Sequence, residues 1–393
     1  MSARKVKVGL AEKSKTSVRS FMVGHSSGYY RILGIVAFLS LLGLAFVLSS
    51  SSVDAIKNGN SGFIVFLKQA MFAILGFIGM LIASKLSFTW VRRYIMIFLL
   101  GAGVLQFLTV TVLGYSVNGN RNWISVFGFF TVQPSEILKL ALILYLADYL
   151  ANRDNDPEIS VTWTRPFWIG IGAIGLVLLG KDMGTAMIMV AILLGVLAFA
   201  GMPRPKLFKY AALVAVGGFF ALQLSSSRIP RIMAWMNPGA PDPMQYNWQQ
   251  THATWAFASG GVTGAGLGQS KLKWSWIPEA ENDFIFAIIG EEGGLLVSIM
   301  VVALFVALIY SLLGAAERTS DDFSRFLILG VLTWVGVQSM VNIAVVLGLL
   351  PVLGVPLPLI SAGGSSLVML LVAVGLVLGA ERQFGQGVAR RKR

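Results

Sequence analysis

The sequence predicts an all-α integral membrane protein with about ten transmembrane helices and with both termini in the cytoplasm. Three observations predict this fold class: 56% of the 393 residues are hydrophobic, only 12% are charged, and the mean hydropathy is +0.75. A water-soluble chain of this size could not cover so much apolar surface with so few polar side chains. Lipid is therefore the solvent that this composition fits.

The predicted helices follow from the lengths of the hydrophobic stretches, since one membrane crossing needs about 20 apolar residues. Lys181 and Asp182 interrupt the stretch 166–201, which as one helix would be about 54 Å long, against a hydrocarbon core of about 30 Å. We therefore expect a helical hairpin with this charged pair at its tip. The ten predicted spans are 32–51, 62–84, 94–113, 135–151, 166–180, 184–201, 206–225, 284–313, 323–349 and 363–381.

The orientation follows from the positions of the 31 Lys and Arg residues. With the N-terminus inside, 22 of them fall on the cytoplasmic side and 8 outside, while Lys139 lies within a span. Cytoplasmic loops carry the excess of positive charge in membrane proteins, so this orientation is favoured over its inverse. The chain is thus expected to have a basic arm at 1–31, a transmembrane domain at 32–381 and a basic tail at 382–393, with its first span as a signal anchor.

The composition also limits the chemistry. The absence of cysteine excludes disulfides, iron–sulfur clusters and thiolate catalysis, and two histidines are too few for a histidine-rich metal site. The net charge of +13 reflects membrane orientation, and no nucleic acid partner is expected. Any site must use carboxylates, Lys, Arg, hydroxyls and backbone groups.

One long segment, 226–283, is predicted to lie outside the membrane before the eighth span. It contains five tryptophans, and aromatic-rich loops beside a membrane tend to lie on its interface. We expect a structured cap over the external side of the bundle. The basic residues at its two ends, Arg228, Arg231, Lys271 and Lys273, are interpreted as partners of lipid head groups.

Asp283 is the strongest candidate for chemistry, because it lies where this loop becomes a span. A helix N-terminus favours the carboxylate and apolar surroundings disfavour it, a balance that suits a general base. An ordinary N-terminal cap is an equally good interpretation. Glu291 and Glu292 lie further along the same predicted helix, roughly 12–13 Å deeper in the span, where a structural pairing with Lys or Arg is favoured over catalysis.

Glu136 and Lys139 follow a Gln-Pro-Ser motif and share one face of the fourth span, being three residues apart. They either neutralise each other inside the bundle, or Lys139 lines a polar cavity that opens outward. The stretch 358–366, with Ser361, Gly363 and Gly364, precedes the last span. Its backbone could hold an anion at a helix start, or its small residues could allow close helix packing.

A second glycine-rich stretch, 260–268, lacks the Gly-Lys-Ser/Thr of a P-loop, so nucleotide binding is rejected there. Together, the external face offers a candidate base, several cations, a glycine-rich helix start and an aromatic cap. This combination suits an anionic substrate carried on a lipid, whose tail enters between spans.

The segments 118–123, 133–139, 182–186, 260–268, 278–287 and 356–366 resemble the SEDS family (FtsW, RodA and SpoVE) in their order along the chain, and the likeness spans nearly all of 30–382. One departure is that Gly180 and Lys181 stand where the family usually has Gln-Pro. The resemblance implies a ten-span peptidoglycan glycosyltransferase in the bacterial cytoplasmic membrane, and it is strongest to the division members, which act at the septum.

The resemblance implies lipid II as substrate, with Asp283 as the catalytic aspartate and with Arg121, Glu136 and Lys139 in substrate binding. Ser361, Gly363 and Gly364 are further substrate-binding candidates. Expected partners are a class B penicillin-binding transpeptidase, other division proteins and membrane lipids. No required cofactor is implied, and Mg²⁺ or Mn²⁺ is kept as a candidate partner of the pyrophosphate. The alternatives are a lipid II flippase, an elongation polymerase of the RodA type, or a scaffold without chemistry of its own.

Overall fold

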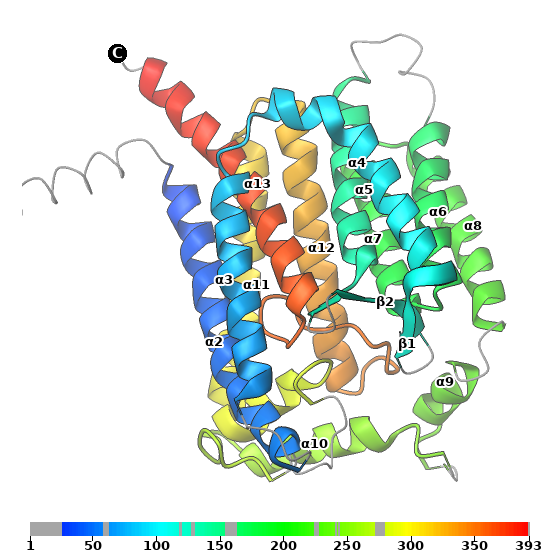
Figure 1. Cartoon of the computed structure of the whole chain (residues 1–393), viewed down its shortest axis with the longest axis vertical. Coiled ribbons are helices and arrows are strands. Elements are labelled where there is room, and N and C mark those ends of the chain that lie inside the picture. The colour runs from blue at the N-terminus through cyan, green and yellow to red at the C-terminus, as the bar shows by residue number, and fades with distance from the viewer. Residues whose placement is uncertain are drawn as a thin grey trace, which may run out of the picture.

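The computed structural model describes the residues 26–57, 63–117, 120–126, 130–153, 163–223, 228–239, 242, 244–271 and 280–391. Most of the basic arm 1–31 lies outside them, as do 118–119 and 272–279. Within the described chain, each of the ten predicted spans falls on a helix of one bundle (Figure 1). These helices are α2 (Ser27–Lys57), α3 (Ile64–Ala83), α4 (Phe88–Leu108), α5 (Pro134–Ala151), α6 (Thr164–Leu179), α7 (Met183–Phe199), α8 (Arg204–Gln223), α11 (Ile285–Arg318), α12 (Asp322–Val346) and α13 (Gly364–Arg391).

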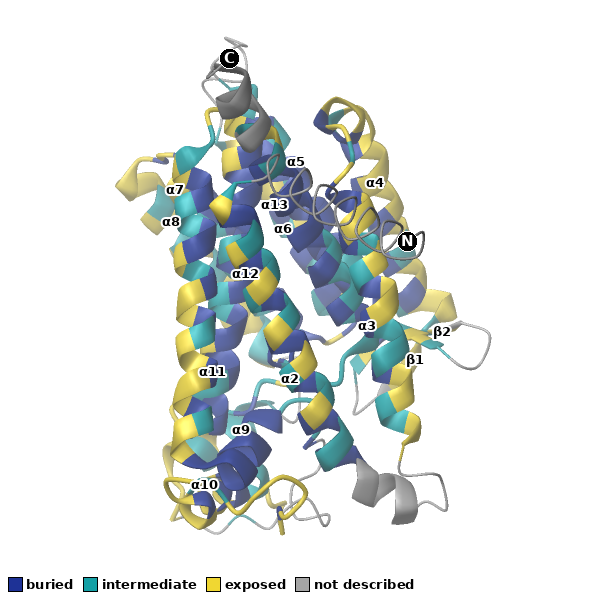
Figure 2. Ribbon diagram, turned by 90° about the vertical axis from the view of Figure 1, so that its left-hand side faces the viewer, coloured by how far each residue is buried: buried dark blue, intermediate teal, exposed yellow. Residues whose placement is uncertain are grey.

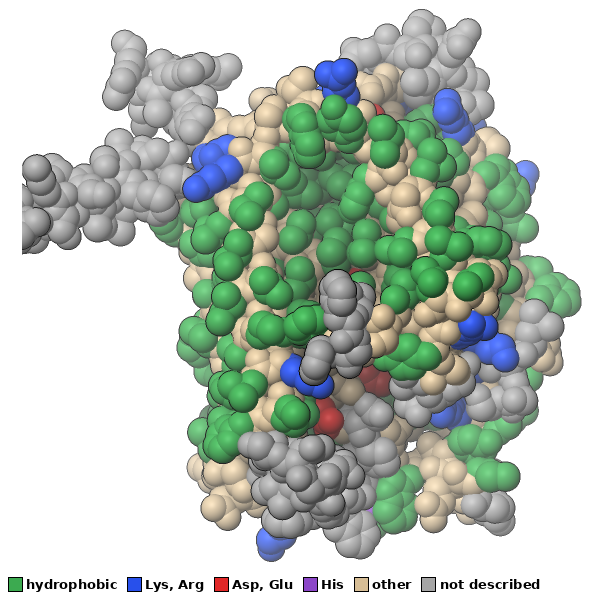
Figure 3. Space-filling view, in the orientation of Figure 1, with side chains coloured by type: hydrophobic (Ala, Val, Ile, Leu, Met, Phe, Trp, Pro, Cys, Tyr) green, Lys and Arg blue, Asp and Glu red, His purple; other side chains and the backbone are tan. Residues whose placement is uncertain are grey.

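The lengths and surfaces of these helices fit a multi-pass membrane protein. Seven of the described helices are long and apolar enough to cross a membrane, and α6 and α7 are shorter apolar helices. Exposed residues run along α4 and α11 (Figure 2), and hydrophobic side chains cover the middle of the face seen in Figure 3. So extensive an exposed hydrophobic surface is typical of a protein that is surrounded by lipid.

The centre and the edge of the bundle differ sharply in burial. Helix α5 is buried along nearly its whole length and packs against α4 and α12. Helix α8 has no buried residue and contacts mainly α7 and the short helix α9 (Arg228–Met236). The edge helix is therefore held by far fewer contacts than the central ones.

The turn between α6 and α7 confirms the predicted hairpin. Lys181 adopts a left-handed backbone conformation with φ of 62°, which reverses the chain. Asp182 then caps α7, because its Oδ1 accepts a hydrogen bond of 2.9 Å from the N–H of Thr185.

Three short strands interrupt the otherwise helical chain between α4 and α5, and the all-α prediction missed them. After a π-helical turn at Thr109–Leu113, the strands β1 (Tyr115–Val117), β2 (Asn120–Val126) and β3 (Phe130–Val132) form an antiparallel sheet in the order β1-β2-β3. The strands β1 and β3 have only three residues each, too few to display an alternating pattern beside a long apolar run.

The segment 226–283 contains two described helices, α9 and α10 (Trp248–Gly260), which lie across one end of the bundle (Figure 1). We call this the α9–α10 end. The indole N–H of Trp235 donates to the carbonyl of Gly348 at 2.8 Å, and the ring of Phe257 lies 5.6 Å from that of Phe286. Helix α9 is thus attached to the chain just after α12, and helix α10 is attached to the start of α11.

Helix α11 is broken, which corrects the predicted eighth span 284–313. Gly294 has φ of 68° and ψ of −168°, so the residues 285–293 form a separate short helix. The glycine-rich stretch 260–268 closes this break, since the N–H groups of Ala265 and Gly266 donate to the carbonyls of Glu291 and Glu292 at 2.9 and 3.0 Å. The glycines there allow two backbones to meet, because a Cβ on Gly260 or Gly264 would collide with this segment.

The break also reverses the predicted depth of Glu291 and Glu292. The carbonyl of Glu281 accepts a hydrogen bond from the N–H of Ala362. Two residues earlier in the same loop, the backbone of Ile360 packs against Gly43 of α2. Glu292, in contrast, accepts hydrogen bonds from Ser49, six residues further along α2. The segment 285–293 therefore runs toward the α9–α10 end, and the prediction that these glutamates lie deeper than Asp283 was wrong.

The described partners of these two glutamates are hydroxyls and backbone N–H groups. Glu291 accepts from the Ser270 hydroxyl and, at 2.9 Å, from the N–H of Lys271. Glu292 accepts from the N–H of Ser270 at 3.3 Å in addition to Ser49. These bonds tie the loop after α10 to the broken start of α11.

Candidate functional site

Asp283 lies half-buried in the turn before α11, opposite the loop that joins α12 to α13. We call residues 351–363 of this connection the 351–363 loop. Gly354 in this loop has φ of 71°, and a Cβ built on it would lie 3.5 Å from Oδ2 of Asp283. The loop backbone thus passes directly beside the carboxylate, with no side chain between them.

The 351–363 loop brings together motifs that are far apart in the sequence. A Cβ on Gly184, in the first turn of α7, would lie 2.7 Å from the carbonyl of Leu353 and 2.8 Å from a methyl of Val355. On its other side, the N–H of Ala362 donates to the carbonyl of Glu281 at 2.8 Å. The capped turn at 182–186 and the turn that carries Asp283 therefore border the same loop.

Asp182 is buried beside this loop with both carboxylate oxygens engaged. In addition to the helix cap, its Oδ2 accepts a hydrogen bond of 2.9 Å from the side-chain amide of Gln133. The backbone N–H of Gln133 in turn donates to the hydroxyl of Ser365 at 3.1 Å. Asp182 therefore joins the start of α7 to the starts of α5 and α13.

Arg228 and Arg231, in the first turn of α9, supply the positive charge at this site. Burial lowers the pKa of the Arg228 guanidinium below its ordinary value, and the charge of Arg231 lowers this pKa further, whereas Asp182 and Asp283 raise it. An arginine remains protonated under such opposing influences. Arg228 therefore lies in the electrostatic field of both carboxylates.

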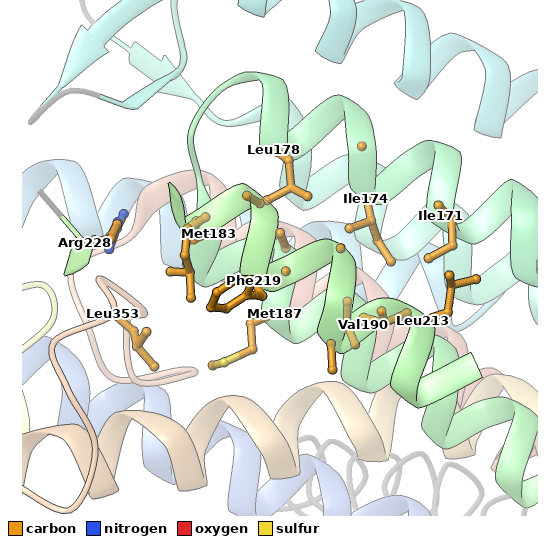
Figure 4. A pocket seen from close by; sticks show the side chains of 18 of the residues that line it. Ile171, Ile174, Leu178, Met183, Met187, Val190, Leu213, Phe219, Arg228 and Leu353 are labelled. Atoms are coloured by element: carbon orange, nitrogen blue, oxygen red, sulfur yellow. The ribbon is translucent and has the colours of Figure 1, made fainter. Parts of the chain in front are cut away.

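An apolar cavity of about 680 Å³ opens between α6, α7 and α8 and ends at these arginines. Figure 4 shows Arg228 and Leu353 at one end of the cavity and Ile171 and Leu213 at the other. Aliphatic side chains, methionines and Phe219 line the wall between the two ends. A long apolar chain with an anionic head would match this distribution of surface and charge.

Glu136 and Lys139 form an ion pair in the middle of the bundle, which is one of the two arrangements that their spacing allowed. Nζ of Lys139 lies 2.9 Å from the Glu136 carboxylate, and the Lys139 side chain is only 1% exposed. It also lies 4.7 Å from the ring centre of Trp334 and donates to Gln338 at 3.3 Å. A small cavity of about 10 Å³, roughly the room of one water molecule, adjoins Glu136 and Ser361.

The remaining predicted site residues hold the surroundings of the site together. Arg121, on β2, is exposed and donates to two carbonyls, from its backbone N–H to Gly180 and from Nε to Gly114, both at 2.9 Å. It thereby joins the small sheet to the α6–α7 turn.

Ser361, Gly363 and Gly364 lie where the 351–363 loop enters α13. The Ser361 hydroxyl accepts from the N–H of Leu357 at 2.8 Å and its carbonyl accepts from the side chain of Gln69 at 3.1 Å. A Cβ on Gly364 would collide with the ring of Phe72 on α3. The glycine at this position thus allows α13 to pack closely on α3.

Sequence reasoning did not select Arg228 and Arg231 as site residues, although they begin the long segment that Asp283 ends. The described residues contain no group of three His, Cys, Asp or Glu side chains that could hold a metal ion.

The chain is similar to known proteins over nearly its whole length. Residues 30–385 match the cell cycle protein family of FtsW, RodA and SpoVE. A probable peptidoglycan glycosyltransferase FtsW of Geobacter sulfurreducens is 37% identical over 350 residues, covering 88% of this chain and 93% of that protein. The Mycobacterium tuberculosis protein of the same name is 36% identical over 365 residues, covering 92% and 69% of the two chains.

The fold is also that of a solved structure. A chain from a peptidoglycan synthase complex that coordinates polymerization and crosslinking superimposes with a TM-score of 0.74. The superposition covers 92% of this chain and 98% of the other, at 24% sequence identity.

Proposed function

Because this chain belongs to the FtsW, RodA and SpoVE family, we propose that it is a peptidoglycan glycosyltransferase that polymerises lipid II. The observations that carry this proposal are the apolar cavity that ends at Arg228 and Arg231, and the position of the Asp283 carboxylate beside Gly354, which directly follows the cavity-lining residue Leu353. The reaction requires a base, a cation and a cavity that can hold a lipid tail.

The proposed orientation has ten spans, both termini in the cytoplasm and the α9–α10 end on the outer face of the cytoplasmic membrane. The distribution of Lys and Arg along the chain supports it. Peptidoglycan is assembled on that face, so the site would open where the product is needed. The FtsW names of the relatives favour a role in septal synthesis during division.

The cavity is proposed to hold the polyprenyl tail of the substrate and the arginines its pyrophosphate. The tail passes from the bilayer into a cavity of the same apolar character, so the cavity contributes by shape and van der Waals packing, and the arginines supply the attraction for the head group. Arg228 and Arg231 have the planar, permanently charged groups that bind phosphate oxygens best. Helix α8, which has no buried residue, would allow the tail to enter sideways from the bilayer.

In the proposed reaction, the Asp283 carboxylate takes the proton of the 4-hydroxyl of the acceptor sugar. The oxygen attacks the anomeric carbon of the donor chain, and the bond from that carbon to the pyrophosphate breaks, releasing undecaprenyl pyrophosphate. Negative charge develops on the leaving group, so Arg228 and Arg231 lower the barrier. Ser361 would border the substrate, Arg121 would hold the small sheet on the α6–α7 turn, and the buried pair of Glu136 and Lys139 would support the site from within.

A class B penicillin-binding transpeptidase is the proposed partner, and the similarity of this fold to a chain of a peptidoglycan synthase complex supports it. Transport of lipid II across the membrane is the competing function. The lining of the cavity argues for the enzyme, because its polar head-group contacts, Arg228 and Arg231, lie at one end only, whereas a flippase needs polar contacts toward both faces.

The decisive test is Asp283→Asn in purified full-length protein supplied with lipid II in detergent, alone and with its transpeptidase partner. Loss of a general base lowers a rate by about 10²–10⁴-fold, so glycan chains should nearly disappear from the gel while the protein remains folded. Near-normal polymerisation by this variant would exclude Asp283 as the base. Absence of glycan chains with the wild-type protein, in the presence of the partner, would favour the transporter.

A further inference from the structure

We propose that Asn342 is a positioning residue for Asp283, because its side-chain amide fixes the backbone from which the Asp283 carboxylate projects. The inference rests on the proposed role of Asp283 as the base. Asn342 lies near the end of α12 and is only 1% exposed. It does not itself border the apolar cavity that is proposed for the lipid.

The amide of Asn342 donates two hydrogen bonds to two separate segments. Nδ2 lies 2.8 Å from the carbonyl of Asp283 and 2.7 Å from the carbonyl of Val355. An NH₂ group has two protons, so both are used. Neither carbonyl belongs to a helix, and buried carbonyls of this kind need a partner from elsewhere in the fold.

These two bonds clamp the turn that carries Asp283 onto the 351–363 loop. Val355 directly follows Gly354, the residue whose backbone passes beside Oδ2 of Asp283. Fixing the carbonyls at 283 and 355 therefore fixes the carboxylate relative to the loop that it faces. A catalytic group displaced by about 1 Å can lose about 10²-fold in rate, so this clamp bears directly on turnover.

The same face of α12 carries a second contact to the loop, one turn earlier. The Gln338 amide donates to the carbonyl of Pro356 at 2.9 Å. Its oxygen accepts from Trp334 at 2.8 Å and from Lys139 at 3.3 Å. Gln338 thus holds the loop, whereas Asn342 holds both the loop and Asp283, which singles out Asn342 as the residue that acts on the base.

The neighbouring residue Ser339 provides a matched control. It is 3% exposed and lies on the same helix, but its hydroxyl bonds the carbonyls of Val335 and Gly336 within α12 itself. Removing this hydroxyl changes a buried polar group without touching the turn of Asp283. Ser339→Ala should therefore leave kcat within about twofold of wild type.

The experiment measures lipid II polymerisation by full-length Asn342→Ala, Asn342→Ser and Ser339→Ala proteins, together with thermal unfolding in detergent. The space left by alanine admits water to the two carbonyls, so the fold persists while the fixed geometry is lost. We expect Asn342→Ala to lower kcat by about 10–100-fold with KM within about threefold. Serine, which supplies one donor instead of two, should give an intermediate kcat.

The inference is overturned if Asn342→Ala keeps kcat within twofold of wild type, or if its loss of activity only follows a loss of folded protein. Failure of both Asn342 variants to fold would assign this residue to stability alone. The Asp283→Asn variant separates the two proposals. An inactive Asp283→Asn beside an active Asn342→Ala rejects only the positioning role, whereas an active Asp283→Asn rejects the base itself.

Discussion

Two regions of this molecule combine a carboxylate with a cation, and the fold places them in opposite surroundings. The pair of Glu136 and Lys139 is enclosed by the central helices, with exposed fractions of 3% and 1%. Asp283 and Arg228 are half-buried, and Arg228 lines a cavity of about 680 Å³ whose wall includes Leu353, the neighbour of the Gly354 that lies beside Asp283. The same chemical types are thus sealed in one region and accessible in the other.

This difference indicates that burial decides whether a carboxylate and a cation mainly stabilise the fold or mainly act on a substrate. A sealed pair has already lost its water and needs its partner to stay charged, so its main effect is on folding. A pair beside a hollow can exchange its contacts for those of a substrate, so its main effect is on binding and chemistry.

The largest effect on stability is expected from Lys139→Met. Removing one partner of a buried ion pair lowers the free energy of unfolding by about 3–5 kcal/mol, since the Glu136 carboxylate is left buried without its cation. Thermal unfolding of the purified protein in detergent measures this change. The double variant Lys139→Met with Glu136→Gln should recover much of the stability, because no charge is then left unpaired.

One result would contradict the assignment of Lys139 to stability rather than to substrate binding. A Lys139→Met protein that unfolds like wild type but shows a strongly raised KM for lipid II would place Lys139 in direct contact with the substrate. The enclosed position of its ammonium group, held by Glu136 and Gln338, argues for the stability effect.

Much of the fold could be predicted because lipid restricts which segments can cross it. The ten hydrophobic stretches all fall on helices, and the charges at Lys181 and Asp182 marked the hairpin correctly. The break at Gly294 could not be predicted, because hydrophobicity continues through it. That break depends on backbone contacts with Gly260 and Gly264, about 30 residues away, which a local pattern does not contain.

For the candidate site, the sequence singled out Asp283 because it lies where the long loop becomes a span, where a helix N-terminus favours the carboxylate and apolar surroundings disfavour it. Arg228 and Arg231 did not stand out, since a basic residue at a membrane surface has an ordinary explanation in lipid head groups. The electrostatic interaction of Arg228 with Asp283 joins residues more than 50 positions apart in the sequence, so it depends on the path that α9 takes at the end of the bundle.

The next largest effect is expected from Arg228→Gln, which tests the accessible region. A hydrogen bond to a charged group contributes about 1.5–3 kcal/mol, so KM for lipid II should rise about tenfold or more while the protein remains folded. Steady-state polymerisation at varied lipid II concentration measures it. Arg121→Gln is the control, because that exposed side chain donates to the carbonyl of Gly114, and a change below about threefold is expected. Equal effects of the two variants would contradict a specific role for Arg228.

The smallest effect is expected from narrowing the cavity with Gly218→Leu. Gly218 lines the cavity, and a Cβ there would meet no atom within 4 Å, so leucine fits but takes space from the lipid tail. The displaced part of the tail stays in lipid, so only van der Waals contacts are lost; about four to eight of them at about 0.1 kcal/mol each weaken binding by about 0.4–0.8 kcal/mol, which should raise KM about twofold to fourfold at unchanged kcat. Gly172→Leu on α6 is the matched control, because that glycine is equally open but does not line the cavity. An unchanged KM for Gly218→Leu, or an equal rise for Gly172→Leu, would show that the tail binds elsewhere on the bundle.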